Sequence, residues 1–353
     1  MNSQQPRYSI IVPVYNRPDE VDELLQSLCE QTVKDFEVVI VEDGSKTPCK
    51  DVCQKYEGLL DLKYFDKPNS GPGQSRNYGA ERSQGDYLLV LDSDVVLPRT
   101  YIEEVSRELD QKPVDAFGGP DRAHPSFTPT QKAISYSMTS FFTTGGIRGS
   151  KKGALDKFFP RSFNMGIRRD VYQELGGFSK MRFGEDIDFS YRIVEAGYQP
   201  RLFADAWVWH KRRTDFRKFF RQVYNSGIAR INLEKRHPGT LKLVHLLPTV
   251  FTVGVLALIL TSAVGRALMH YDEPNWRSWY WVALLPWIPI LFYSLVIFID
   301  SSAKNKSLKV GLLSVPAAFV QLMGYGFGFI ESWWKRCVLK QDEFTAFEKT
   351  FYS

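Results

Sequence analysis

Two aspartates separated by one residue follow an apolar stretch of the sequence. Asp92 and Asp94 come directly after Tyr87–Leu91, which carries no charge. A strand covered on both faces has a continuous apolar run, so we predict a buried parallel strand with both aspartates at its carboxyl end. Ligands of open α/β sheets bind at that edge. There one aspartate can bind a hydroxyl and the other Mg²⁺ or Mn²⁺, although an isolated pair of this kind more often belongs to a loop that caps a helix.

A second acidic pair and a glycine-rich segment suit the same kind of site. Glu42 and Asp43 follow a predicted strand, Phe36–Val41, and can either accept hydrogen bonds from a base or ribose or form a turn. Residues 69–77 contain glycines that permit close backbone approach, and Arg76 opens the helix expected there. These features favour binding of a pyrophosphate, although the segment lacks the G-K-[ST] of a Walker A loop.

A third acidic pair opens a predicted helix. Ile187, Tyr191 and Val194 recur at helical spacing, which puts Glu185 and Asp186 in the first turn. Carboxylates are favoured at a helix amino terminus, so this pair has a purely structural explanation as well as a chemical one.

The segments around these residues alternate between strands and helices. Apolar runs predict strands at Tyr8–Val14, Phe36–Val41, Leu62–Phe65 and Arg201–His210, and helical spacing predicts a helix over Asp19–Glu30. A strand, a helix and a second strand within 45 residues form a βαβ unit, so we predict an α/β fold with a largely parallel sheet.

Four short segments then carry a resemblance to a known family. Ile10–Arg17, Val41–Ser45, Gly71–Gly79 and Leu91–Asp94 occur in the order and spacing of family 2 glycosyltransferases with the GT-A fold, and the chain resembles the membrane-anchored bacterial members. The resemblance implies a Rossmann-like, nucleotide-binding mixed sheet flanked by helices, followed by C-terminal transmembrane helices. It also implies a nucleotide-sugar donor, with a UDP-sugar favoured.

The resemblance also implies roles for individual residues. The implied donor-binding residues are Pro13, Tyr15, Glu42, Asp43, Arg76, Asp92 and Ser93. Asp94 and His210 are the implied ligands of Mg²⁺ or Mn²⁺, although a lone histidine at a strand end is more often a surface or core residue. Asp186 is the implied catalytic base, with Glu185 orienting the acceptor or a loop. Because a helix amino terminus lowers the pKa of an aspartate, burial or Glu185 would have to compensate.

The contacts with the acceptor are less sharply marked in the sequence. The candidate acceptor or diphosphate contacts are Asn164, Met165, Arg212 and Arg213. Segment Asp121–Gly153 is rich in Ser, Thr, Gly and aromatic residues and has no clear period, which favours a lid or acceptor-binding loop over a disordered segment.

Three apolar runs follow the predicted catalytic domain. Residues 243–265, 278–299 and 310–330 carry almost no charge, and each exceeds the roughly 18 residues that can cross a bilayer. Buried core helices are the alternative, but three such runs in succession favour membrane spans. We therefore predict a glycosyltransferase domain over 1–239 and a membrane domain over 240–353.

The segment before these runs is basic and amphipathic. Residues 212–232 place Phe216, Phe219 and Val223 on one helical face and arginines and lysines away from it. Such a helix suits a membrane interface, and an ordinary helix packed on the domain is an equal alternative. No apolar signal segment opens the sequence, so we expect the catalytic domain on the cytosolic side of the inner membrane.

The third run conflicts with the distribution of positive charge. Three complete spans would put Lys335, Arg336 and Lys340 outside, which the positive-inside rule disfavours. This run also contains Gly324 and Gly326, so a re-entrant segment or a packed small-residue face is the alternative, and the side of the C-terminus stays open.

Composition limits the remaining possibilities. The net charge of +5 over 353 residues is modest, and we expect no nucleic-acid partner. Four scattered cysteines predict neither a disulfide framework nor a zinc site.

The function expected is sugar transfer by an inverting single displacement, because the sequence offers no candidate nucleophile for a double one. The acceptor expected is a lipid-linked saccharide or polyprenyl phosphate, with membrane lipids as partners. A processive synthase is one alternative, although Gln222 does not begin the Q-x-x-R-W motif of such enzymes. A membrane-anchored protein that only binds nucleotide sugars is another.

Overall fold

The chain forms two compact units in a computed structural model, which describes residues 5–124, 126–144, 158–271 and 275–347. Unit 1 comprises Met1–Pro125, Leu155–Lys211 and Phe347–Ser353. Unit 2 comprises Ser126–Ala154 and Arg212–Ala346. This grouping joins segments from both predicted domains, because part of the range 1–239 packs with the apolar helices. The two predicted domain ranges stay a prediction.

Unit 1 is built on a mixed sheet of seven strands in the order β3-β2-β1-β4-β8-β6-β9. The strands are β1 (Tyr8–Val14), β2 (Phe36–Asp43), β3 (Leu62–Lys67), β4 (Tyr87–Leu91), β6 (Ala116–Gly118), β8 (Asn164–Arg168) and β9 (Arg201–Leu202). The first four are mutually parallel, whereas β8 runs antiparallel to both β4 and β6. This mixed sheet confirms the predicted fold class.

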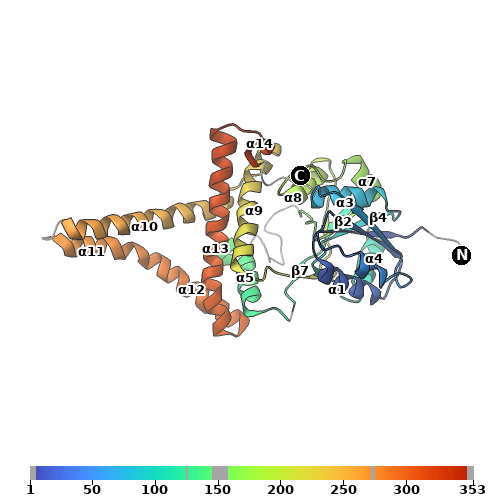
Figure 1. Ribbon diagram of the computed structural model, residues 1–353, viewed down its shortest axis with the longest axis horizontal. Coiled ribbons are helices and arrows are strands. Elements are labelled where there is room, and N and C mark those ends of the chain that lie inside the picture. The colour runs from blue at the N-terminus through green and yellow to red at the C-terminus, as the bar shows by residue number, and fades with distance from the viewer. Residues whose placement is uncertain (1–4, 125, 145–157, 272–274, 348–353) are drawn as a thin grey trace. The chain divides into compact units, whose positions relative to one another are not determined.

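Helices cover both faces of this sheet (Figure 1). They are α1 (Pro18–Cys29), α2 (Lys50–Gln54), α3 (Pro72–Glu81), α4 (Tyr101–Gln111), α7 (Arg169–Glu174) and α8 (Glu185–Glu195). Side chains alternate across a strand, so Ile10 of β1 joins the core under α1 and α4 while Ile11 joins the core under α7 and α8. Burial on both faces explains the unbroken apolar runs of the parallel strands.

A small second sheet lies next to the end of β4. It consists of β5 (Val95–Val96), β10 (Val208–His210) and β7 (Asp121–Arg122), with His210 paired to Val95. The single strand predicted over Arg201–His210 is therefore wrong, because β9 and β10 belong to different sheets. The apolar pattern hid this break because Phe203 and Ala206, in the intervening bend, are both buried in the core.

Unit 2 is helical. Its elements are α5 (Pro129–Thr139), α6 (Phe141–Thr144), α9 (Phe216–Arg236), α10 (Leu247–Tyr271), α11 (Trp276–Leu284), α12 (Ile288–Asn305), α13 (Leu308–Trp333) and α14 (Glu343–Phe347), with short helical turns at Leu243–His245, Leu285–Trp287 and Trp334–Val338. Three helical stretches are long and apolar enough to cross a membrane: Leu243–Tyr271, Arg277–Asn305 and Leu308–Val338. The predicted apolar helices are thus present.

Part of the predicted lid segment is a helix of unit 2. α5 begins with a capping box in which Thr128 and Gln131 bond to each other's backbone N–H groups. Its residue Ala133 packs with Val310 and Ala317 of α13. Residues 145–153 of the predicted lid lie outside the described part of the chain.

Candidate active site

Three predicted site segments meet because parallel strands end at the same edge of the sheet. β1, β2 and β4 are parallel neighbours, so the residues that follow Val14, Val41 and Leu91 lie along one edge. This brings Tyr15 and Asp92 to the edge where ligands of α/β folds bind. Tyr15 has an exposed fraction of 49% and leaves its ring available for stacking.

Asp92, Asp94 and His210 form the cluster that could hold a metal. Each offers one ligand atom, and these atoms lie within 4.8 Å of one another. His210 Nε2 is 3.2 Å from Asp94 Oδ1, and its Nδ1 is 3.8 Å from Asp121 Oδ2. Burial opposes protonation of His210, but Asp121 and Asp94 outweigh it and raise the pKa to about 9. Two carboxylates and an imidazole are a suitable donor set for a divalent cation such as Mn²⁺.

Two arginines neutralise the carboxylates of this cluster. Arg17 donates a hydrogen bond to Asp94 Oδ2. Arg76 Nη2 donates to Asp92 Oδ1 at 2.9 Å, and Arg76 Nη1 donates to Glu185 Oε1 at 3.0 Å. Because the Arg76 side chain is almost fully buried, it links the cluster firmly to the first turn of α8. The aspartate pair at β4 and the acidic pair of α8 therefore belong to one site.

The acidic pair of α8 is held in two different electrostatic environments. Arg161 Nε donates to Asp186 Oδ2 at 2.7 Å, and the Ile187 N–H donates to Asp186 Oδ1 at 2.9 Å. Burial alone would raise the pKa of Asp186, but the charges of Arg161 and Arg76 and these hydrogen bonds hold it below its usual value. Burial and the neighbouring Asp186 raise the pKa of Glu185, although Arg76 opposes this. Asp186 thus has the lower pKa of the pair.

The acidic pair of β2 is engaged by the protein itself. Glu42 is fully buried and accepts hydrogen bonds from the Ser45 hydroxyl and from the Cys49 N–H at 2.7 Å. Asp43 accepts from the N–H groups of Ser70 and Gly71 at 2.9 and 2.8 Å. In this arrangement Asp43 fixes the loop that leads into α3.

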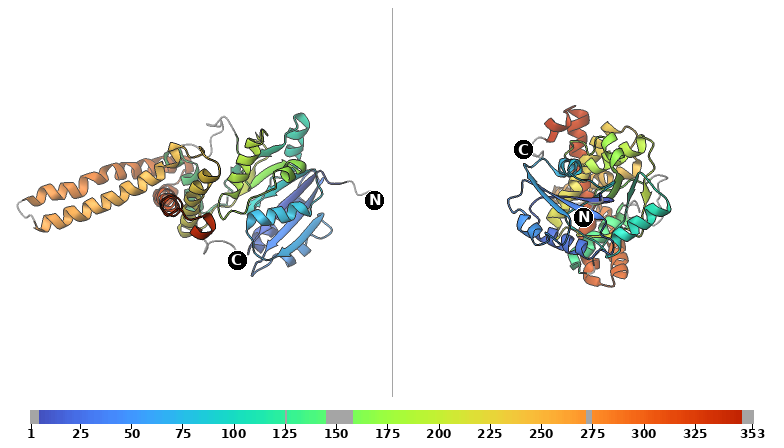
Figure 2. Two further views of the ribbon diagram at one scale, coloured as in Figure 1. Left: turned by 90° about the horizontal axis from the view of Figure 1, so that it is seen from above. Right: turned by 90° about the vertical axis from the view of Figure 1, so that its right-hand side faces the viewer.

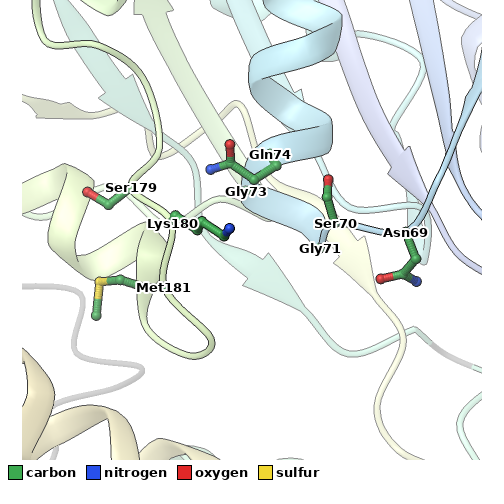
Figure 3. A pocket seen from close by; sticks show the side chains of 8 residues that line it. All are labelled: Asn69, Ser70, Gly71, Gly73, Gln74, Ser179, Lys180 and Met181. Carbon is green, nitrogen blue, oxygen red and sulfur yellow. The ribbon is translucent and has the colours of Figure 1, made fainter. Parts of the chain in front are cut away.

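That loop lines a cavity of about 200 Å³ (Figure 3). The lining residues are Asn69, Ser70, Gly71, Gly73, Gln74, Ser179, Lys180 and Met181. Gly71 has a φ of +92° at the start of α3, a conformation that glycine adopts without strain. The cavity therefore combines the amino terminus of α3 with a loop that precedes the acidic pair of α8.

The remaining predicted residues lie in less open positions. Pro13 and Ser93 are buried beside the strand ends. Asn164 is enclosed, bonded to the Tyr101 hydroxyl and the Ala206 carbonyl, and Met165 is in the core, so neither side chain is open to an acceptor in this structure. Arg212 and Arg213 belong to unit 2, and their contact with a diphosphate stays a prediction.

A comparison with protein families decides what this arrangement represents. Residues 9–176 match the model described as glycosyl transferase family 2. This match covers just under half of the chain. The matched segment contains the four family-like segments and ends before α8, so Asp186 and His210 lie outside it.

Relatives and a solved structure agree with this assignment. A glycosyltransferase of uncharacterised function from Haemophilus influenzae is 33% identical over 192 residues, covering 53% of this chain and 62% of that protein. Glycosyltransferase AglE from Haloferax volcanii is 24% identical, covering 72% of this chain and 83% of AglE. The chain thus spans less than two thirds of the Haemophilus relative.

The structural relative extends the likeness to the fold. The mannosyltransferase PcManGT from Pyrobaculum calidifontis, solved with GDP-Man and Mn²⁺, has a TM-score of 0.56 at 14% identity. The match covers 95% of this chain and 89% of PcManGT. The fold of the glycosyltransferase domain is therefore the GT-A fold.

Sequence reasoning missed two arginines of this site. Arg17 is the last residue of the first family-like segment, and Arg161 lies three residues before β8. Neither position carries a local pattern that indicates an acid partner. Their proximity to the predicted aspartates becomes visible only once the sheet brings β1, β4 and β8 together.

Proposed function

We propose that this protein transfers a sugar from a nucleoside-diphosphate sugar to an acceptor hydroxyl or phosphate. The observation that carries the proposal is the continuous link from Asp94 through Asp92 and Arg76 to Glu185 and Asp186. It supplies anion-binding groups, a metal-suited cluster and an ionised carboxylate at one edge of the sheet.

The donor half of the site is the carboxyl edge of β1, β2 and β4. Tyr15 would stack its ring on the base, and Asp92 would accept a hydrogen bond from a ribose hydroxyl. Arg76 and Arg17 supply the positive charge that a diphosphate requires. A UDP-sugar is the favoured donor; the GDP-Man of PcManGT makes a GDP-sugar the second candidate to test.

A divalent cation fits the Asp92, Asp94 and His210 cluster. These residues would hold it, and it would supply neutralisation of the charge on the leaving diphosphate. Mg²⁺ and Mn²⁺ are the candidates, and the Mn²⁺ in PcManGT favours the second.

Asp186 is the proposed base. As the acceptor oxygen forms its bond to the anomeric carbon, the bond to the diphosphate oxygen breaks and the acceptor proton passes to Asp186. Each Asp186 oxygen accepts one hydrogen bond from the protein and keeps a second acceptor position. Attack opposite the leaving group inverts the anomeric configuration.

The proposed acceptor is lipid-linked, either a saccharide or a polyprenyl phosphate. Three helices long and apolar enough for a membrane support this choice, because they would hold the enzyme where such acceptors lie. Localisation of the glycosyltransferase domain on the cytosolic face of the inner membrane is part of the same proposal.

The experiment that tests the donor reaction measures release of nucleoside diphosphate. Purified protein is incubated with UDP-, GDP- and dTDP-sugars, with Mn²⁺ or Mg²⁺ or EDTA, and with or without membrane lipid extract. We expect metal-dependent release from one donor, reduced at least about 100-fold in Asp94→Asn. Asp51→Asn, an exposed carboxylate on α2, is the matched control and should retain full activity. Release that persists unchanged in EDTA and in Asp94→Asn would contradict the proposal.

A further inference from the structure

The apolar helices of unit 2 differ in how they are packed. α10 and α11 lie side by side, α12 continues from α11 and diverges from α10, and α13 runs across the base of this hairpin (Figures 1 and 2). Only 11% of the apolar window of each hairpin arm is buried inside the protein, against 44% for α13. The hairpin is therefore suited to lipid on most of its surface, whereas protein covers almost half of the apolar window of α13.

The glycines of α13 show what encloses it. A Cβ on Gly328 would lie 2.0 Å from the Tyr224 carbonyl of α9, and a Cβ on Gly326 would lie 2.1 Å from the Thr252 hydroxyl of α10. Positions two apart lie on nearly opposite sides of a helix. α13 is thus sandwiched between α9 on one face and the base of α10 on the other.

The contact with α9 extends along the second half of α13. Ser332 donates to the Ile228 carbonyl at 3.1 Å, and Arg336 donates to Asn232 Oδ1 at 2.8 Å. Together with Gly328 against Tyr224, these contacts show that the two helices run parallel and side by side. α9 must therefore lie at the same depth in a membrane as the part of α13 that it contacts.

α9 is too polar to share a path across the hydrocarbon core. Its charged residues are Arg217, Lys218, Arg221, Arg230, Glu234, Lys235 and Arg236. The cost of one such charge at the bilayer centre is about 2.5 to 3.5 kcal/mol on the insertion scale. α5, which flanks the first half of α13, adds Lys132. A spanning α13 would carry several of these charges into lipid.

We propose that the chain crosses the membrane only twice, through the α10–α12 hairpin, and that α5, α9 and α13 form a layer in the headgroup region at its base. The partner of this layer is the bilayer interface itself. At about 1.5 Å per residue, the 25 residues of α10 reach roughly 37 Å, enough for a hydrocarbon core of about 30 Å. The exposed Tyr271 and Trp281 near the hairpin tip suit the opposite interface.

The charge distribution agrees with two crossings. An even number of crossings returns the chain after α12 to the side of residues 1–236. The basic residues at both ends of α13 then lie on that one side: Lys304, Lys306, Lys309, Lys335, Arg336 and Lys340. The basic residues on that side outnumber Arg266 and Arg277 near the hairpin tip, as the positive-inside rule expects, whereas three crossings would violate the rule. The proposal does not depend on the chemistry of the glycosyltransferase domain.

Cys337 provides a native probe of this topology. It is exposed just beyond α13, whereas Cys49 and Cys53 are buried. In a Cys29→Ser background, Cys337 is labelled with a membrane-impermeant maleimide in right-side-out cells and in inverted vesicles. Lys55→Cys and Tyr271→Cys, each combined with Cys337→Ser, mark the two sides. We expect Cys337 to be labelled from the side that labels Lys55→Cys. Labelling from the side of Tyr271→Cys would overturn the proposal, and so would no labelling from either side.

A depth measurement tests the orientation of α13 directly. Spin labels at Leu312→Cys, Met323→Cys and Trp333→Cys sample its start, middle and end in nanodiscs, with Leu291→Cys in α12 as the reference for the hydrocarbon core. We expect equal interfacial depths for the three α13 positions and a deeper Leu291 label. A helix that spans would put the Met323 label about 16 Å deeper than the Leu312 label, which would contradict the proposal.

Discussion

At the residue scale, the site is a set of carboxylates held by arginines. The sequence indicates the carboxylates because each pair either follows a predicted strand or opens a predicted helix. The carboxyl ends of strands are where ligands of α/β sheets bind, so a pair at such an end is a site candidate by position alone. Two of their arginine partners could not be predicted, since Arg17 is 77 residues from Asp94 and Arg161 is 25 residues from Asp186. Only the folded sheet makes these distances short.

The pKa of Asp186 should depend on Arg161. Arg161→Gln removes the charge that opposes burial, so the pKa of Asp186 rises and less of it is ionised at a given acidic pH. The acid limb of the kcat/KM profile should therefore move to higher pH. Arg168→Gln removes a surface arginine that pairs with Asp115 and Asp170, and it should leave the limb in place. An unmoved limb in Arg161→Gln would show that Arg161 does not set this pKa.

Arg17 should compete with a metal ion for Asp94. Arg17→Gln removes a positive charge from one oxygen of this carboxylate, so the affinity for Mn²⁺ without donor should rise, by about tenfold or 1.4 kcal/mol. Titration calorimetry measures this directly. Arg107→Gln, a surface variant paired with Glu104, is the control. Weaker binding of Mn²⁺ in Arg17→Gln would mean that Arg17 supports the metal site instead of competing with it.

At the element scale, the sequence predicted segments with a clear period and missed those without one. α1 is predicted because its apolar residues recur at every third or fourth position. The strands β1, β2 and β4 are predicted because each is an unbroken apolar run. α5 was read as part of a lid because its buried residues contact α13, more than 170 residues away, and include Ala133 and Ser137, which are poor hydrophobic signals. Tertiary partners, and not local pattern, fix such elements.

The α9 and α13 pair should be sensitive to one added methyl group. Gly328→Ala would place a Cβ 2.0 Å from the Tyr224 carbonyl, so the helices must separate. We expect a loss of about 1 to 3 kcal/mol in the free energy of unfolding of unit 2, seen as a lower Tm in detergent. Gly254→Ala on α10, where nothing lies within 4 Å of the added Cβ, should be neutral or slightly stabilising. Equal Tm values for the two variants would contradict this account of the packing.

At the scale of the whole molecule, the chain combines a domain that matches glycosyl transferase family 2 with helices suited to a membrane. The sequence predicted the three apolar helices by length, but their different packing became visible only with α5, α9 and α13 assembled. Composition cannot distinguish a helix that crosses lipid from one enclosed by polar neighbours.

The most direct test of sugar transfer compares the proposed base with a matched aspartate. Transfer of radiolabelled sugar from the preferred donor into lipid extract is measured for wild type, Asp186→Asn and the exposed Asp170→Asn. We expect Asp186→Asn to lose about 100-fold or more in kcat while Asp170→Asn stays active. Binding of the nucleotide product should persist in both variants. Full transfer activity in Asp186→Asn would contradict the proposed chemistry of this site.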